Sequence, residues 1–497
     1  MKDNMITVIS FTDPRLTALL KEREEYIKGE HRKLVELLAS EFDVYDVMKD
    51  MGKYEAEIFG ISGEEEVEKA VNLINSKGTA GIVVGLWHWT EPHLVLKLAK
   101  ATNSPLLLYS ADDPSWAGTT CVSAVGASLW ESSLTPNMIK HNRVKGNLEE
   151  VKRWARGVIG AYKLRRATII LWGGTYSLGM EHLMDDMSAL KAMIGDIIIE
   201  DQYILVKGAE SILEEDRERI ERFVGALEEL GKGVSYDGKM LNRSILEREV
   251  ALYLAAKDRV AELSKGKEVG GVSIKCQPEL SEVYGVDACL IPAFMPFGED
   301  PEGSKPIIPT VCEGDIKGLI TSTLLYYISG KPPLFGDLKY VGDGYFMIAN
   351  CGASSIYYAS LSEKMEDNLA KVKIMPQCQG KGGGAVMYRT PPTLLTVARI
   401  TRVNRKYYMQ VLVTESLPFG PEVERGLKWG KEWPHTLLKL KVDQGLFLEA
   451  VGSNHFSAIP GDYLKELTYA CEELGIRLVR LDNESSIKAF LHEVKRT

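Results

Sequence analysis

The stretch that decides the fold lies at residues 81–109 and reads GIVVGLWHWTEPHLVLKLAKATNSPLLLY. Its first six residues form a continuous apolar run, which is typical of a strand that is buried on both faces. Residues 91–101 then follow a helical pattern, and residues 105–109 end in a second apolar run. A strand, a helix and a second strand in this order predict a βαβ unit with parallel strands.

The same alternation continues on both sides of this stretch, with further apolar runs such as residues 6–10 and 168–172. After about residue 340 the segments become short, β-rich and punctuated by glycine, which is typical of an antiparallel sheet or barrel. The sequence therefore predicts an α/β protein with two Rossmann-like α/β domains, residues 1–165 and 166–340, followed by a β-rich C-terminal domain, residues 341–497.

Some local expectations can be tested directly against a structure. Residues 287–292 and 446–451 are mostly apolar and are expected to be strands, and residues 210–230 are expected to form one helix. The loop at residues 173–179 follows a predicted strand and contains three glycines. It lacks the spacing of a dinucleotide-binding motif, so we interpret it as a tight turn between a strand and a helix.

Composition limits the classes of function. The chain has 497 residues, of which 45% are apolar and 26% charged, and its net charge is -9. This is the composition of an ordinary globular protein with several domains. No basic stripe is visible, so we predict no nucleic-acid partner.

Membrane insertion and secretion are not expected either. No apolar run approaches the roughly 20 residues that a membrane span needs, and the N-terminus does not resemble a secretory signal. The seven cysteines are scattered and none forms a CxxC pair. We interpret them as reduced thiols that mostly fill the core, and we predict a cytoplasmic protein.

Two carboxylates and one histidine stand where a metal-dependent enzyme would need them. Glu313 follows an apolar strand in Thr310-Val311-Cys312-Glu313-Gly314-Asp315, and Asp337 closes Pro333-Leu334-Phe335-Gly336-Asp337. Between them, residues 316–329 are apolar and long enough for a helix of about four turns. His455 is a third candidate far along the chain. Two carboxylates and one imidazole with open positions suit a divalent ion of the Mn²⁺ type.

Each candidate also has a structural interpretation. Glu313 could be a helix N-cap or an acid of the first helical turn, and Asp337 could be a turn residue after Gly336. Asp315 is a rival to Glu313, but we interpret it as the cap of the following helix. His455 is expected in a polar turn. The position of Glu313 at a strand end favours function, because open α/β sheets bind ligands beyond the carboxyl ends of their strands.

Aromatic and histidine residues after the strand at residues 81–86 offer a further possible binding surface. Trp87 could stack against the C–H groups of a sugar, or it could pack at a domain interface. His88 and His93 are possible metal ligands, although nothing in their spacing distinguishes them.

The segment from Glu313 to Asp315, the apolar helix, Phe335-Gly336-Asp337 and the late Asn454-His455 pair together resemble the L-fucose isomerase family, part of the fucose/arabinose isomerase group. The resemblance implies that Glu313, Asp337 and His455 bind a divalent ion, usually Mn²⁺. It also implies a three-domain architecture. The arabinose branch uses a second metal histidine, for which the only intervening candidate is His435, so the fucose-type ligand set fits better.

Weaker correspondences extend this resemblance over most of the chain. They imply that Arg15, Trp87, Gln277 and Asn454 contact the substrate, with Arg15 and Trp87 reaching the site of a neighbouring subunit in a homo-oligomer, a trimer or hexamer. The chain is shorter than typical members. The C-terminal tyrosine of the family cannot be placed, and Gln379 or Tyr388 occupies its general region.

The resemblance implies an aldose–ketose isomerase, an intramolecular oxidoreductase, that acts on a deoxy-hexose or pentose such as L-fucose. One carboxylate would move the C2 proton to C1 through an enediol, and the other would assist the hydroxyl proton. Two other functions stay open. The chain could be a non-catalytic sugar-binding protein, or a metal-dependent epimerase or lyase that uses the same ligands.

Overall fold

The structure is a computed structural model that describes residues 5–15, 17–132 and 140–496. Its internal contacts divide the chain into two compact units. The first unit comprises Met1–Lys163 and Lys465–Glu473, and the second comprises Leu164–Leu464 and Leu474–Thr497. One short late segment, most of helix α16 (Leu464–Leu474), therefore belongs to the first unit although the chain on both sides of it belongs to the second.

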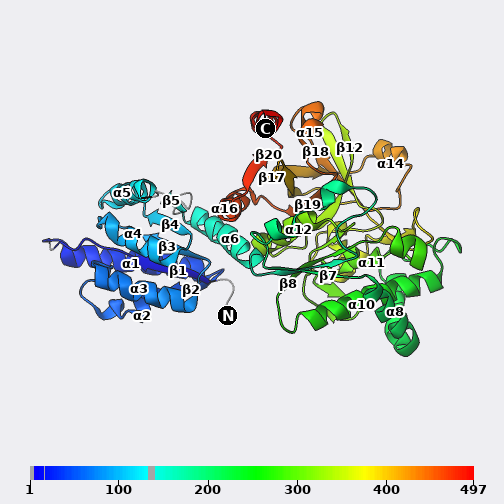
Figure 1. The fold of residues 1–497 in the computed structure, drawn as a ribbon, viewed down its shortest axis with the longest axis horizontal. Coiled ribbons are helices and arrows are strands. Elements are labelled where there is room, and N and C mark those ends of the chain that lie inside the picture. Colours follow the sequence, from blue (N-terminus) through cyan, green and yellow to red (C-terminus); the bar gives the residue numbers. More distant parts are fainter. Residues whose placement is uncertain (1–4, 16, 133–139, 497) are drawn as a thin grey trace. The chain divides into compact units, whose positions relative to one another are not determined.

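The first unit is built on a five-stranded parallel sheet with the order β2-β1-β3-β4-β5 (Figure 1). The strands are β1 (Met5–Ser10), β2 (Asp43–Asp46), β3 (Gly81–Gly85), β4 (Leu106–Ser110) and β5 (His141–Lys145). The helices are α1 (Leu20–Ala39), α2 (Val47–Asp50), α3 (Glu64–Lys77), α4 (Pro92–Thr102), α5 (Gly118–Glu131) and α6 (Leu148–Leu164). The predicted βαβ unit is β3, α4 and β4, and its strands pair in parallel.

The core of the first unit explains why residues 81–85 are apolar and begin and end with glycine. All five residues of β3 are buried. A Cβ atom at Gly81 would lie 2.7 Å from the ring of Trp154 in α6, so only glycine lets this helix pack so closely on the sheet. At the other end of β3, the indole of Trp87 donates a hydrogen bond to Ser10 Oγ at 2.8 Å.

The second unit contains a four-stranded parallel sheet with the order β11-β8-β6-β7. Its strands are β6 (Thr168–Trp172), β7 (Asp196–Glu200), β8 (Val269–Ile274) and β11 (Thr310–Cys312). The helices that accompany them are α7 (Met187–Leu190), α8 (Tyr203–Glu215), α9 (Arg217–Glu229), α10 (Arg243–Leu263), α11 (Leu290–Phe294) and α12 (Ile316–Ser329). A small pair, β9 (Glu299–Asp300) and β10 (Gly303–Ser304), lies between β8 and β11 in the sequence.

The same unit carries a seven-stranded sheet with the order β16-β19-β12-β13-β18-β17-β20. Its strands are β12 (Leu334–Gly342), β13 (Tyr345–Ala349), β16 (Leu394–Val403), β17 (Lys406–Leu417), β18 (His435–Lys439), β19 (His455–Pro460) and β20 (Arg477–Arg480). Because β16 also pairs with β17, six antiparallel strands close into a ring, and β20 adds in parallel at β17. The remaining elements are α13 (Met365–Leu369), β14 (Lys373–Pro376), β15 (Gly384–Met387), α14 (Pro421–Gly426), α15 (Gln444–Ala450) and α17 (Glu484–Arg496).

The mixed α/β fold with parallel sheets and a β-rich C-terminal region agrees with the predicted fold class. The expected boundary at residues 340 and 341 falls inside β12. The division into three domains and the Rossmann-like character of the first two stay predictions.

The local expectations were partly wrong. Residues 446–451 are mostly helical, because the Asp443 side chain caps α15 by accepting a hydrogen bond from the Leu446 N–H. Residues 287–292 lead into α11, where Pro292 stands in the first turn and so leaves no helical hydrogen bond unmade. The expected single helix at 210–230 is divided into α8 and α9 at Asp216, whose φ of -135° is not helical.

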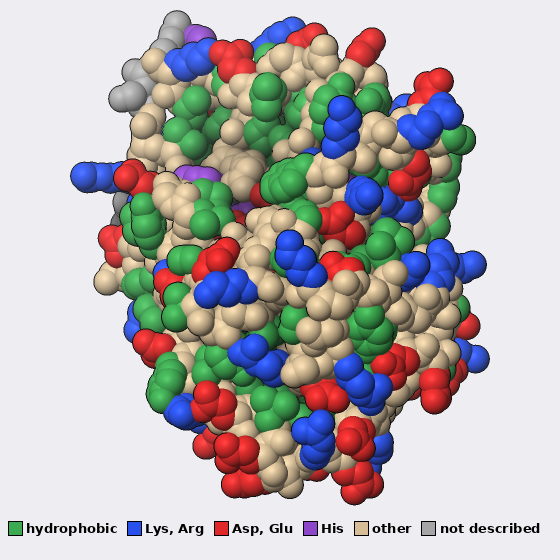
Figure 2. Space-filling model, turned by 90° about the vertical axis from the view of Figure 1, so that its right-hand side faces the viewer, with side chains coloured by type: hydrophobic (Ala, Val, Ile, Leu, Met, Phe, Trp, Pro, Cys, Tyr) green, Lys and Arg blue, Asp and Glu red, His purple; other side chains and the backbone are tan. Residues whose placement is uncertain are grey.

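The surface in Figure 2 mixes acidic, basic and apolar side chains, and the described residues of this face form no continuous basic patch. Within the described part of the chain, no helix combines the length and the apolar character that a membrane span requires.

Candidate functional site

Glu313, Asp337 and His455 converge on one point in the second unit. Each offers one ligand atom, and these atoms lie within 4.8 Å of one another. His455 Nε2 is 3.1 Å from Glu313 Oε2 and 3.3 Å from Asp337 Oδ1. Glu313 comes from the carboxyl end of the parallel sheet, whereas the other two come from the antiparallel sheet. The site therefore lies where the two sheets of this unit meet.

Asp337 and His455 meet because they are opposite residues on paired strands. In the antiparallel ladder of β12 and β19, Asp337 is the direct partner of His455. Opposite side chains on such strands point to the same face, with Cβ atoms about 5 Å apart. Both turn interpretations are therefore wrong. Asp337 lies within a strand, and His455 is a buried residue that begins one.

Glu313 reaches the site through an unusual backbone. Its N–H still donates to Ile274 O at 2.9 Å, which continues the pairing of β11 with β8, but its φ is +65°. Non-glycine residues adopt this conformation rarely and at a cost of about 1–3 kcal/mol. Gly314 follows at φ +69°, and a Cβ there would lie 2.4 Å from Gly174 O. The loop at residues 173–179 therefore supports the turn that presents Glu313.

Asp315 begins α12, as expected for a helix cap, since its side chain accepts a hydrogen bond from the Gly318 N–H at 2.9 Å. It also lies against the histidine of the site, with His455 Nδ1 2.8 Å from Asp315 Oδ2. Burial raises the pKa of Asp315, but Arg399 and His455 outweigh burial and lower this pKa well below its ordinary value. The interpretation of Asp315 as a cap was thus incomplete.

The imidazole of His455 is held among three acids. Burial lowers the pKa of His455, but contacts with Asp315, Asp337 and Glu313 outweigh burial and raise this pKa above its ordinary value. Without a cation, a proton on the imidazole partly balances the surrounding negative charge. A divalent ion would supply this positive charge instead.

The residues present fit a divalent cation. Glu313 Oε2 is buried and accepts no hydrogen bond from the described residues, although His455 Nε2 lies nearby. A buried carboxylate oxygen without a partner is costly unless a charge compensates it. Two carboxylates and one imidazole are suitable ligands for Mn²⁺ or a similar ion. No other group of three or more His, Cys, Asp or Glu side chains converges in this way in the described residues, so His88 and His93 belong to no such cluster.

Comparison with known families bears on the part of the chain that carries His455. Residues 348–482 match the family model described as L-fucose isomerase, C-terminal domain. The match supports the L-fucose isomerase family. None of the curated proteins matches the chain. The matched range contains Asn454 and His455, whereas Glu313 and Asp337 precede it, so the resemblance of these two acids to that family rests on the sequence alone.

Asn454, an expected substrate contact, is hydrogen-bonded at both ends of its amide. Its Nδ2 donates to Asp337 Oδ1 at 2.7 Å, and its Oδ1 lies 2.9 Å from His182 Nε2. These bonds fix the orientation of Asp337. His182, in the short 3₁₀ helix Glu181–Leu183, was not anticipated, because no spacing in the sequence sets this histidine apart.

Gln277 follows β8 and donates its amide N–H to Gln379 Oε1 at 3.1 Å. Gln379, one of the two residues in the region where the family's C-terminal tyrosine could not be placed, is thus the hydrogen-bond partner of Gln277. The hydroxyl of Tyr388, the other candidate, is buried and donates to Ser355 O. Near the acids, Cys351 Sγ lies 3.9 Å from Glu313 Oε1, and burial raises the pKa of this thiol.

Arg15 and Trp87 belong to the first unit. The side chain of Arg15 is 69% exposed and pairs with Asp13 at 2.6 Å. Trp87 is buried, and its ring packs edge-on against Tyr109. Their expected contacts with a substrate at the site of a neighbouring subunit stay predictions.

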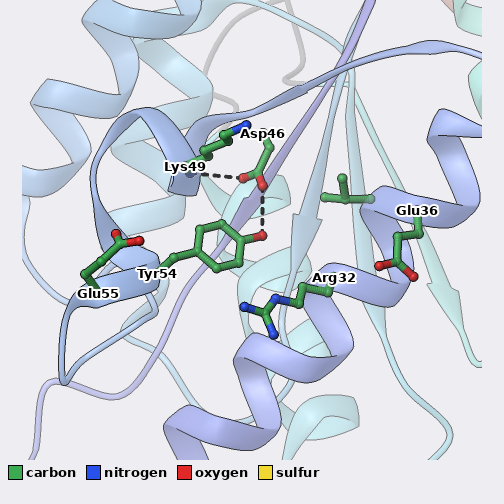
Figure 3. A pocket seen from close by; sticks show the side chains of 7 residues that line it. Arg32, Glu36, Asp46, Lys49, Tyr54 and Glu55 are labelled. Carbon is green, nitrogen blue, oxygen red and sulfur yellow. Dashed lines mark hydrogen bonds between the residues drawn. The ribbon is translucent and has the colours of Figure 1, made fainter.

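The first unit also contains a hollow of about 400 Å³ (Figure 3). The residues that line it are Arg32, Val35, Glu36, Asp46, Lys49, Tyr54 and Glu55. The carboxylate of Asp46 in this hollow is already hydrogen-bonded within the protein. It accepts hydrogen bonds from Tyr54 Oη at 2.8 Å and from the Lys49 N–H at 3.2 Å (Figure 3). None of the buried oxygens that lack a partner in the described residues lines this hollow. We therefore assign the candidate site to the second unit.

Proposed function

We propose that the chain is a metal-dependent aldose–ketose isomerase that acts on a deoxy-hexose or pentose such as L-fucose. The observation that carries this proposal is the convergence of Glu313, Asp337 and His455 within 4.8 Å, two of them on opposite strands. The match of residues 348–482 to an L-fucose isomerase domain supports a sugar as the substrate.

In this proposal Glu313, Asp337 and His455 hold a divalent cation, Mn²⁺ in the first instance. A bound cation of this kind supplies Lewis-acid polarisation of a carbonyl group and orients neighbouring oxygens. The chain supplies the rest. Phe335 packs on the His455 ring at 4.9 Å between centroids, which makes one wall of the site apolar.

The two carboxylates differ in their surroundings. Glu313 is buried and has one oxygen that accepts no hydrogen bond from any described residue, whereas the side chain of Asp337 is 32% exposed and has one oxygen held by Asn454. In the proposed reaction one carboxylate takes the proton from C2 of the aldose and returns it to C1, and the other moves the hydroxyl proton. Proximity compensates for the weak basicity of a carboxylate in such a step.

Two further points complete the proposal. The homo-oligomer, a trimer or hexamer, follows from the resemblance alone. A cytoplasmic location is favoured by the cysteines, all seven of which are free thiols in this structure.

The test is incubation of the protein with Mn²⁺ and a panel of L- and D-aldoses in deuterated water. We expect a ketose that carries deuterium at C1, because a carboxylate that holds the proton can exchange it with solvent. Glu313→Gln and Asp337→Asn should abolish turnover with the fold retained, since each keeps its size but loses its charge. Substitution of the exposed Asp343 by Asn is the control and should leave turnover unchanged.

The outcomes separate the proposed isomerase from its alternatives. A metal-loaded protein that binds a sugar but forms no product would indicate a binding protein. Deuterium at C2 of a recovered aldose with inverted configuration would indicate an epimerase. Ketose without deuterium would instead point to a hydride shift.

A further inference from the structure

A buried chain of charged groups leads from the candidate metal site into the protein. Asp315 is fully buried, and its Oδ2 contacts both the guanidinium of Arg399 and His455 Nδ1. Arg399, in β16, is buried as well, and within the described part of the chain its Nε and Nη2 have no hydrogen-bond partner. The geometry therefore places one carboxylate between a permanent cation and the imidazole.

This arrangement selects one form of the imidazole. A carboxylate paired with a guanidinium can only accept hydrogen bonds, so the proton of a neutral His455 must reside on Nδ1. The lone pair of Nε2 then faces Glu313 Oε2 and Asp337 Oδ1, which lie 3.1 and 3.3 Å away. Histidines that ligate metals are commonly held in this way by a second group.

Gly318, in the first turn of α12, makes room for these contacts. A Cβ atom at Gly318 would lie 2.6 Å from Asp315 Oδ2 and 2.8 Å from Arg399 Nη1. Only glycine at this position lets the carboxylate, the guanidinium and the first turn of α12 approach one another. The cap of α12 is therefore a buried carboxylate packed against a guanidinium, unlike a helix cap at the surface.

We propose that Asp315, itself backed by Arg399, is a positioning residue that fixes the ring and tautomer of His455 so that Nε2 is directed at the cation. This inference rests on the proposed function, because it assumes that a cation binds at Glu313, Asp337 and His455. It assigns to Asp315 a role that is separate from capping α12.

Asp315→Asn separates the two roles. Asparagine caps helices about as well as aspartate, so a residue that only caps α12 should tolerate this change. An amide carries no charge and can turn its NH₂ toward Nδ1, which would move the imidazole proton to Nε2 and block the ligand atom. Loss of such a partner typically lowers metal affinity by about 10–100-fold. We expect a loss of that size in the Kd for Mn²⁺, measured by titration of the metal-free protein.

The neutral variant leaves Arg399 without its acid, which can impair folding. The double variant Asp315→Asn with Arg399→Met removes both charges together, and the same loss of Mn²⁺ affinity is expected from it. Ser322→Ala is the matched control. Ser322 Oγ bonds Ser457 Oγ at 2.7 Å, so the control disturbs the same contact of α12 with β19 but does not touch His455.

The measurements are the Kd for Mn²⁺ and the unfolding temperature of each metal-free protein. Weaker Mn²⁺ binding in the Asn variant or the double variant, with an unchanged Ser322→Ala protein, would support the inference. A lower unfolding temperature with unchanged Mn²⁺ affinity would overturn it, since Asp315 would then act only on stability. Absence of Mn²⁺ binding by the wild type would overturn the proposed function together with the inference.

Discussion

Asp287 should make the second unit less stable as the pH rises. This residue is 1% exposed, its Oδ2 has no hydrogen-bond partner among the described residues, and its Oδ1 receives a contact from Cys276 Sγ at 3.7 Å. The pKa of Asp287 is raised from 3.8 to about 7, because burial and, to a smaller extent, the charge of Glu282 raise it by more than the Cys276 thiol lowers it. The folded chain therefore keeps a proton on this carboxyl that the unfolded chain has already released.

This difference in protonation determines whether the stability of the folded chain rises or falls with pH. Below about pH 4 both states are protonated, and between pH 4 and pH 7 only the folded state is, so stability falls as the pH rises through this window. A difference of about three pH units corresponds to roughly 4 kcal/mol in total, and to about 2.5 kcal/mol between pH 5 and pH 8. Above pH 7 both states are ionised and the effect is constant.

Asp287→Asn should remove this dependence, because the amide resembles the protonated acid but does not ionise. We expect the stability of the variant relative to the wild type to rise by about 2.5 kcal/mol from pH 5 to pH 8. The assay is urea unfolding at both pH values, with substitution of the exposed Asp343 by Asn as the control. An equal difference between variant and wild type at the two pH values would refute the reasoning.

Three other predictions concern the turn, the core and the cation. Gly314→Ala should lower the unfolding temperature and weaken Mn²⁺ binding, since a Cβ would lie 2.4 Å from Gly174 O at φ +69°; an unchanged Kd would show that the turn does not position the site. Trp87→Phe should lose about 1 kcal/mol in urea unfolding, because Ser10 Oγ loses its indole donor; unchanged stability would contradict this. Mn²⁺ at about 100 times its Kd should stabilise the protein by about 2.7 kcal/mol in a manner reversed by EDTA and absent in His455→Ala.

The sequence predicted elements whose local pattern agrees with their tertiary environment. The run at residues 81–85 is buried on both faces of a parallel sheet, so its composition alone identifies the strand. Residues 446–451 are also apolar, but the Asp443 cap and the packing of one face decide for a helix. An apolar run of this length carries no period that separates the two structures.

The candidate site was predicted only in part, because only its local patterns can be recognised in the sequence. Glu313, Asp337 and His455 could be singled out from their residue types and their places along the chain, and the resemblance added the expectation that they act together as ligands. Asp337 and His455 face each other because β12 pairs with β19. This pairing joins distant parts of the chain, so no local sequence pattern indicates it. The contact of Asp315 with His455 depends on the packing of α12 against β19, so only the capping role of Asp315 was visible in the sequence.

Helix α16 has a consequence for how the protein is made. A Cβ at Gly157 in α6 would lie 2.5 Å from Glu466 O and 2.8 Å from Tyr469 Cβ, so the two helices are in close backbone contact. Residues 465–473 leave the ribosome only after residues 1–464, so this face of α6 stays uncovered until they have been made. A fragment that ends at residue 163 would be an unfinished unit with an open helix face. The first unit therefore cannot be exchanged between proteins as a single continuous cassette, and its assembly is tied to that of the unit that carries the acids.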